Sequence, residues 1–224
     1  VRTAPNPTQF ESIVQNLRDD NYARAVDMAR LTMKWEDKDV YNLFLAVATE
    51  LSADNEKANP AVATYALEMA QRVNATPQPE NYLWHAKIYE RLQNMDKAAD
   101  AVEEYLRVQP NDDEMRHSLM MLCVQMNDLQ RAQSVMAVLV KRQPDNWQYL
   151  ITYARLLSGV QTPWVQIFPY VERAIQIGGD DARRLIIENQ PGNLILPYVQ
   201  QDSRILNLLG SDFLPASVTQ SATE

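Results

Sequence analysis

The feature that most constrains the fold of this chain is a repeat with a period of 34 residues. Ala98 and Ala132 are separated by this interval, and so are Pro110 and Pro144, which close two Gln-Pro pairs. Tandem repeats of this length are small supersecondary structures that stack on their neighbours and bury a continuous core between them. The chain also has five glycines against twelve prolines, which argues against a β-sandwich with glycine turns. The sequence therefore predicts a helical array.

Each repeat is expected to consist of two amphipathic helices joined by a short polar turn. In the repeat at residues 79–112, Tyr82 and Ala86 share one face of the first helix, because residues four apart lie one above the other. In the second helix, the small side chain of Ala98 is expected where neighbouring helices touch, whereas Ala99 is expected to be exposed. Neither helix can bury its apolar face alone, so each pair must pack against the next.

The second helix of each repeat is expected to begin at a short polar residue, four positions before a small alanine. A side-chain oxygen at this place can accept a hydrogen bond from the free N–H groups of the first helical turn. Pro60 suits the first helical position, where a missing N–H costs nothing. The predicted N-caps are Asn21, Asn59, Asn94 and Asp128.

Together these residues resemble the tetratricopeptide repeat, a helix–turn–helix unit with large, small and aromatic residues at set positions. The repeat after 79–112 departs from this pattern at Met120, where glycine or alanine is usual, and a more degraded repeat begins at Trp147. The resemblance implies an all-α, right-handed α-solenoid of about five tetratricopeptide-type helix pairs. The residues that carry it in the best repeat are Tyr82, His85, Ala86, Tyr89, Ala98, Val102 and Pro110.

The array is expected to occupy residues 8–209, of which residues 180–209 form an atypical carboxy-terminal cap. Terminal repeats of such arrays are unusual because one of their faces must meet water. Residues 1–7 and residues 210–224 are rich in Pro, Ser and Thr without periodicity, and are expected to be a disordered segment and a disordered tail.

The cap is expected to contain one helix at residues 180–189 and a short helix within residues 198–209. Before it, Pro169 lies inside a helix expected at residues 164–177. A proline there should kink this helix or delay its start, since it lacks the N–H that a helix interior needs.

Charge and hydropathy restrict the partners. A net charge of −8 with 21 Lys plus Arg disfavours nucleic acid and anionic membranes, because phosphate binding needs basic charge. The longest apolar runs, such as residues 135–140, are far shorter than the roughly 20 residues that span a bilayer. We therefore expect a protein or peptide partner, no nucleic acid and no membrane insertion by this segment.

The compartment is less constrained by the sequence. The chain begins at Val1 and not at Met, which leaves open whether a signal peptide, an anchor or an upstream domain has been removed. Scarce lysine and cysteine favour a bacterial periplasm or cell envelope, with the cytoplasm as alternative.

Catalysis would need a nucleophile, a base and an orienting group in one pocket, and the candidates are Cys123, His85 and His117. Cys123 falls at a core position of the repeat, where it is expected to pack. His85 falls at another core position and is expected to be a partly buried, hydrogen-bonded side chain, and His117 is expected to face the inner groove or solvent. Two histidines and one cysteine offer little for zinc, and the methionines of residues 113–146 are expected to fill the core rather than bind copper. We expect no enzyme activity, no catalytic residue, no cofactor and no metal.

In solenoids of this kind the first helices of successive repeats line an extended concave groove. The chain is therefore expected to be a non-catalytic protein–protein interaction scaffold that binds a partner peptide or helix there. The alternative is a regulatory or oligomerisation domain of a larger enzyme whose catalytic part lies outside this chain. The expected groove residues are Asn42, Leu83, Lys87, Glu90, His117, Met121, Gln125, Ile151 and Arg155.

The best-known groove of the family grips a terminal carboxylate with lysines and asparagines. Among the expected groove residues, only Lys87 and Arg155 are lysine or arginine. The asparagine that the family pairs with the lysine is missing from the expected groove residues of the same helix. The mixture of apolar and charged groups is more typical of binding to an extended peptide or a helix.

Overall fold

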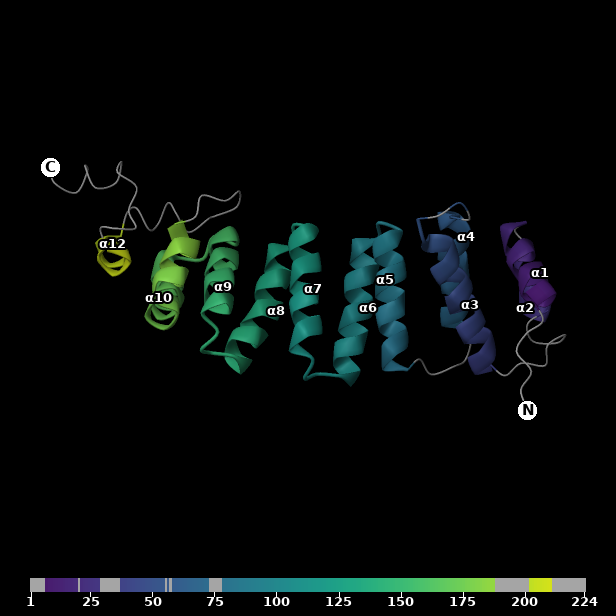
Figure 1. Ribbon diagram of the computed structural model, residues 1–224, viewed down its shortest axis with the longest axis horizontal. Coiled ribbons are helices and arrows are strands. Elements are labelled where there is room, and N and C mark those ends of the chain that lie inside the picture. The colour runs from purple at the N-terminus through teal and green to yellow at the C-terminus, as the bar shows by residue number, and fades with distance from the viewer. Residues whose placement is uncertain are drawn as a thin grey trace. The chain divides into compact units, whose positions relative to one another are not determined.

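A computed structural model describes the chain at residues 7–19, 21–28, 37–54, 56, 58–72, 78–187 and 202–210. In this part of the chain the regular structure is entirely α-helical, and the helices follow one another as antiparallel pairs (Figure 1). The expected all-α solenoid of helix pairs is confirmed. The chain divides into two compact units, the N-terminal unit at residues 1–111 and the C-terminal unit at residues 112–224.

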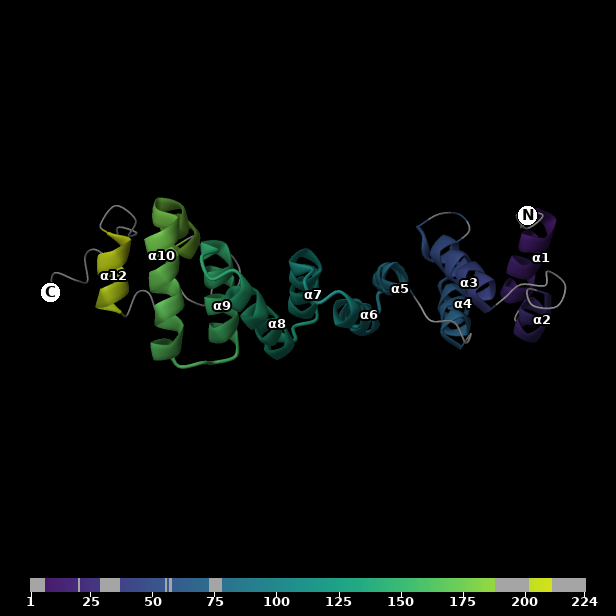
Figure 2. The same ribbon diagram turned by 90° about the horizontal axis from the view of Figure 1, so that it is seen from below.

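The described residues of the N-terminal unit form three helix pairs, and in each pair the two helices pack against each other (Figure 2). Its helices α3 and α5, the first members of successive pairs, also pack together. The helices are α1 (Pro7–Arg18), α2 (Tyr22–Asp27), α3 (Asp37–Ser52), α4 (Pro60–Arg72), α5 (Pro79–Arg91) and α6 (Met95–Val108).

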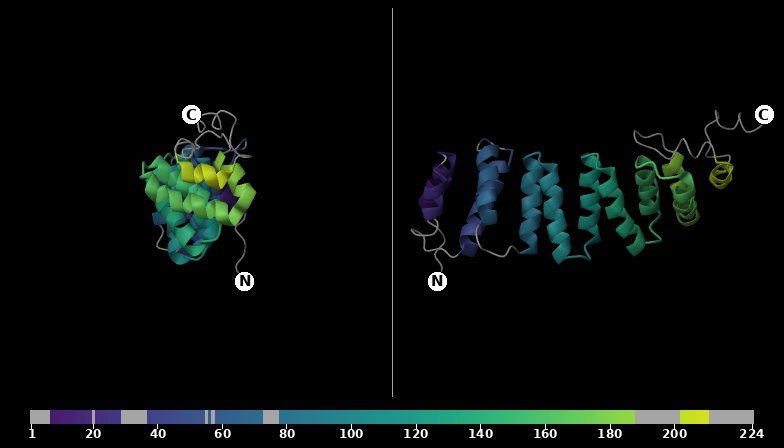
Figure 3. Two further views of the ribbon diagram at one scale, coloured as in Figure 1. Left: turned by 90° about the vertical axis from the view of Figure 1, so that its left-hand side faces the viewer. Right: turned by 180° about the vertical axis from the view of Figure 1, so that it is seen from behind.

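In the C-terminal unit, the part of the chain that the structure describes forms two helix pairs and a short helix that lies beside α10 (Figure 3). The second pair packs on the first through α8 and α9. The helices are α7 (Asp113–Gln125), α8 (Leu129–Arg142), α9 (Trp147–Gly159), α10 (Trp164–Ile187) and α12 (Ser203–Leu209). The two segments expected to be disordered lie outside the described residues, except that Pro7 begins α1 and Gly210 follows α12.

Three of the four predicted N-caps are confirmed. In each of them the side-chain oxygen accepts a hydrogen bond from the backbone N–H three residues further on, at 3.0–3.2 Å. These residues are Asn59, Asn94 and Asp128. The fourth prediction is wrong in this respect, since Asn21 precedes α2 without a side-chain hydrogen bond to it. Asp112 and Asn146 cap the first helices α7 and α9 in the same way, which the repeat pattern did not predict.

The turn between the two helices keeps one backbone geometry in the last three pairs. Its central residue is left-handed, with φ of 57° at Gln93, 60° at Asn127 and 61° at Gln161. The N–H of the next residue then bonds a carbonyl five residues back, at 2.9 Å in all three turns. This is the Schellman closure of a helix end, and it recurs with the 34-residue period seen in the sequence.

The core is built largely from the small and apolar positions of the repeat pattern. Ala63, Ala98 and Ala132 are fully buried, and so is Cys123, as expected. Ala99 is fully buried as well, so the expectation that it is exposed is wrong. Two adjacent residues of α6 are therefore both buried, so the face of this helix that packs in the core is wider than the repeat pattern indicates.

The predicted helices at 164–177 and 180–189 are joined as α10, which breaks at Gly179 with φ of 55°. A Cβ atom at Gly178 would lie 2.7 Å from the ring of Trp147, so glycine is required there for close packing. Helix α10 begins at Trp164, before Pro169, so the expected delay of its start is wrong. The carbonyl that loses its partner belongs to Val165, whose side chain is 70% exposed, so water can reach this part of the helix.

Helix α12 is held against α10 by polar contacts of three kinds. The indole Nε1 of Trp164 donates to Asp202 at 2.6 Å, and Nε of Arg183 donates to the carbonyl of Leu208 at 3.0 Å. The guanidinium of Arg204 lies 4.1 Å from the ring centroid of Phe168. A short terminal helix was predicted within residues 198–209, and the structure begins it at Ser203.

Candidate functional site

A groove of about 460 Å³ opens between α3 and α5 in the N-terminal unit. These are first helices of successive pairs, the position at which the sequence predicts binding. The lining of the groove includes the apolar side chains of Leu45 and Ala46, and Trp84, which has 44% of its surface exposed. We call it the α3/α5 groove, and its lining residues are Asn42, Leu45, Ala46, Thr49, Glu50, Asn81 and Trp84.

Two carboxamides line the α3/α5 groove from its two helices. Asn42 is an exposed residue of α3, and Asn81 is a partly buried residue of α5. A carboxamide offers both a donor and an acceptor, which is what one peptide group needs. Asn81 also hydrogen-bonds the Tyr41 side chain, so the exposed Asn42 is the carboxamide of the lining with the most accessible donor and acceptor.

Charged side chains border the groove. The ammonium group of Lys87 lies 5.3 Å from the ring centroid of Trp84, within the range of a cation–π contact. The guanidinium of Arg91 donates to the backbone carbonyl of Thr49 at 3.3 Å and so ties α5 to α3. Arg91 thus links the two helices of the groove, and Lys87 places a positive charge next to the exposed indole.

The expected groove residues of the N-terminal unit are only partly those that line the groove. Asn42 lines the groove. Lys87 is not part of the lining, but its ammonium group contacts the ring of Trp84, which is. Glu90 is exposed and Leu83 is half-buried, and neither belongs to the lining.

The sequence interpretation placed the groove face of α5 one residue away from its actual position. It missed Asn81 and Trp84, which lie three apart on α5 and therefore share a face. The sequence did offer one signal, because Trp84 directly precedes His85. His85 was expected in the core and so could not face the groove, which left its neighbour Trp84 as a candidate for the groove face.

In the C-terminal unit the expected groove residues separate into exposed and buried ones. Met121 is 52% exposed on α7, and Gln125 is exposed one turn further along. His117 is half-buried, with its ring stacked on Tyr149 at 5.8 Å and an interplanar angle of 18°.

One groove prediction for this unit is wrong, and another falls on a residue that links two helices. Ile151 is fully buried, so it packs in the core and offers no surface to a partner. Arg155 is partly buried, and its guanidinium donates to the backbone carbonyl of Leu185 at 2.7 Å, which links α9 to α10. Both residues therefore contribute to the packing of the fold.

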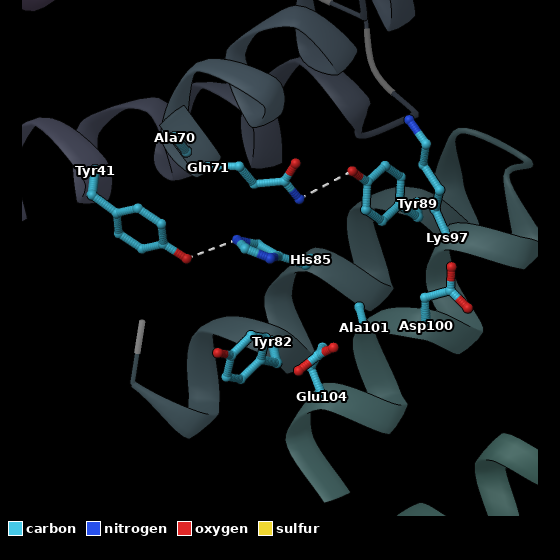
Figure 4. Close-up of a pocket in the computed structure, with 10 residues that line it drawn as sticks. All are labelled: Tyr41, Ala70, Gln71, Tyr82, His85, Tyr89, Lys97, Asp100, Ala101 and Glu104. Carbon is cyan, nitrogen blue, oxygen red and sulfur yellow. Dashed lines mark hydrogen bonds between the residues drawn. The ribbon is translucent and has the colours of Figure 1, made fainter. Parts of the chain in front are cut away.

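A second cavity, of about 380 Å³, lies in the N-terminal unit among α3, α4, α5 and α6 (Figure 4). We call it the aromatic cavity, and it shares no lining residue with the α3/α5 groove. Its lining residues are Tyr41, Ala70, Gln71, Tyr82, His85, Tyr89, Lys97, Asp100, Ala101 and Glu104.

His85 and Tyr41 form a buried hydrogen bond in the wall of the aromatic cavity. The Tyr41 hydroxyl and Nε2 of His85 are 2.7 Å apart. Burial lowers the pKa of His85 from 6.5 to about 4. Burial also raises the pKa of Tyr41 well above 10, with a further contribution from Tyr82. Both groups are neutral at pH 7, and His85 has the buried, hydrogen-bonded role that the sequence predicts.

Among the described residues, no three His, Cys, Asp or Glu side chains gather in a way that could hold a metal ion. The described helices also include none that is both long enough and apolar enough to cross a membrane. Of the methionines, Met120 and Met136 are buried between helices as predicted, and Met121 is exposed.

Comparison with known proteins assigns no family to the chain. No family model matches it, and no curated protein matches it. Among solved structures, the crystal structure of the MamA protein has a similar fold at 13% sequence identity and a TM-score of 0.43, over 79% of this chain and 93% of that chain. This likeness is too weak to assign a family. That the chain is a helical repeat protein follows from its own helix pairs.

Proposed function

We propose that this chain is a non-catalytic protein-interaction scaffold of the tetratricopeptide type, which binds a peptide or a helix of a partner protein on the first helices of its repeats. The observation that carries the proposal is the α3/α5 groove, whose lining combines an exposed indole, apolar side chains and the exposed carboxamide of Asn42. Its volume of about 460 Å³ falls in the range of protein pockets that enclose a ligand.

Trp84 is the expected centre of binding energy in the groove. Tryptophan is enriched among the few interface residues that dominate affinity, because its large ring loses much exposed surface on contact. Leu45 and Ala46 supply apolar surface in the same lining, and the exposed carboxamide of Asn42 can satisfy a peptide group that would otherwise be buried without partners. An apolar side chain flanked by accessible backbone is the element of a partner that fits this arrangement.

The C-terminal unit offers a second contact surface on a first helix. Met121 and Val124 are three residues apart on α7 and are 52% and 39% exposed. A flexible methionine next to a valine forms an adaptable apolar face, which suits contact with a helix.

The groove is tested with peptides selected from a random library on the wild-type chain. Calorimetry then compares each peptide on wild type, Trp84→Ala and Asn42→Ala. We expect Trp84→Ala to weaken binding at least tenfold, which corresponds to about 1.4 kcal/mol, and Asn42→Ala to weaken it less.

Val165→Ala is the matched control, because Val165 is an exposed apolar residue of the C-terminal unit. It should leave the affinity unchanged, and circular dichroism should show that all three variants stay helical. Selected peptides that bind Trp84→Ala as tightly as wild type would place binding outside the α3/α5 groove.

A further inference from the structure

The walls of the aromatic cavity are tyrosine and histidine rings held in fixed positions. The rings of Tyr41 and His85 have centroids 6.0 Å apart, and Tyr82 meets His85 edge-on at 6.2 Å. Nε2 of Gln71 donates to the Tyr89 hydroxyl at 3.2 Å, which fixes that ring as well (Figure 4). Aromatic faces carry the negative part of the ring quadrupole and attract cations. The cavity wall is therefore suited to a positive charge.

An ammonium group of the chain itself already contacts this wall. Nζ of Lys97 lies 5.5 Å from the ring centroid of Tyr89, at one side of the cavity (Figure 4). Lys97 is exposed, and a cation–π contact at an exposed site is worth only about 0.5–1 kcal/mol. A second cation can displace it at small cost.

Carboxylates line the same cavity on α6. Asp100 and Glu104 stand one helical turn apart and both belong to the lining. Glu104 pairs with Arg107, but these side chains are 44% and 69% exposed, and such surface pairs contribute at most about 1 kcal/mol.

The wider charge distribution also favours a positive ligand. Helix α6 carries four acidic and two basic side chains, and residues 1–111 carry 17 acidic and 12 basic ones. At neutral pH the buried His85 adds no positive charge, since burial holds its pKa at about 4. An anion would therefore meet net repulsion at this cavity, whereas a cation would meet attraction from both the carboxylates and the rings.

We propose that the aromatic cavity binds a primary alkylammonium or guanidinium group, with the cation against the tyrosine rings and Asp100 and Glu104 as its counter-ions. The group can belong to a lysine or arginine side chain or to a small free amine. This site is additional to the α3/α5 groove, because the two share no lining residue.

The test is a nuclear magnetic resonance titration of the whole chain with n-butylammonium at physiological salt, with n-butanol as the neutral analogue of the same shape. We expect saturable shifts of the resonances of Tyr82, Tyr89 and Ala101 with n-butylammonium and none with n-butanol. Shifts of equal size with both compounds, or no saturable shift with n-butylammonium, would overturn the proposal.

Variants on α6 separate a local counter-ion from general surface charge. Glu104→Gln is expected to raise the dissociation constant of n-butylammonium at least threefold. Glu103→Gln removes the same charge from the next residue, which is not part of the lining, and should leave the constant unchanged. Lys97→Gln removes the resident ammonium and should lower the constant at least threefold. Equal effects of Glu103→Gln and Glu104→Gln, or weaker binding by Lys97→Gln, would contradict the site.

Two further arms identify the source of the cation and keep this proposal separate from the groove. Tighter binding of Nα-acetyl-lysine methylamide than of n-butylammonium assigns the site to a side chain of a protein, and the reverse assigns it to a free amine. Trp84→Ala should leave the n-butylammonium constant unchanged, because Trp84 does not line the aromatic cavity. A loss of binding in Trp84→Ala would show that the two sites are one.

Discussion

The imidazole of His85 makes the stability of the N-terminal unit depend on pH. Its pKa is about 4 in the folded chain and 6.5 in the unfolded chain, because burial disfavours the charged ring. Above pH 6.5 both states are neutral and the group contributes no pH dependence. Between pH 6.5 and pH 4 the unfolded state binds a proton that the folded state does not, so stability falls as the pH falls. Below pH 4 the loss is complete.

We therefore expect the free energy of unfolding to decrease by roughly 3 kcal/mol between pH 7 and pH 4 through His85. Urea denaturation at a series of pH values measures this decrease. His85→Gln keeps hydrogen-bonding capacity towards Tyr41 but does not titrate, so it should lack this decrease whatever its stability at pH 7. His117→Gln, on the half-buried histidine of α7, should retain it. A His85→Gln profile as steep as that of wild type would contradict the assignment.

At the scale of helices and turns, the repeat is closed by a left-handed residue that is not glycine. Gln93, Asn127 and Gln161 all have φ near 60°, a region that costs an ordinary side chain about 1–2 kcal/mol. The cost is tolerated because this conformation lets two N–H groups of the turn bond the last carbonyls of the first helix. The turn geometry thus orients the second helix of each pair against the first.

Substitution of Gln93 tests this role. A β-branched residue is least compatible with positive φ, so Gln93→Val is expected to lower the free energy of unfolding by about 1–2 kcal/mol. Gln93→Gly should be at least as stable as wild type, since relief of strain offsets the greater freedom of the unfolded chain. Chemical denaturation measures both variants. The control is Gln130→Val on the exposed side of α8, which should change stability by about 0.5 kcal/mol or less.

At the scale of the whole molecule, the chain is two compact units, and each holds a core of its own between paired helices. The stability of a repeat protein is approximately a sum of helix-pair and neighbour terms. A cut between pairs therefore removes fewer contacts than a cut inside a pair.

We expect the fragment of residues 112–224 to fold by itself, with a helical circular dichroism spectrum and a cooperative thermal transition. The comparison is the fragment of residues 129–224, which lacks α7 and so uncovers the face of α8 that packs on it. This shorter fragment should melt at a lower temperature and less cooperatively. Equal melting of the two fragments would show that the α7–α8 pair is not a structural unit.

The helix pairs and the buried roles of His85 and Cys123 could be predicted from the 34-residue spacing and the alanine positions. The short polar residues before the second helices predicted four caps, of which three form the hydrogen bond. These features are local or periodic, and local hydrogen bonding and helical periodicity act within one repeat. Only the tertiary structure decided which side of each first helix meets its neighbour. It buried Ile151, tied Arg155 to Leu185 and left Trp84 exposed. The reason is that the exposure of a side chain depends on which neighbouring helices cover it, and the pattern within one repeat does not contain that information. The aromatic cavity was invisible in the sequence for the same reason, since its walls come from four helices that only packing brings together.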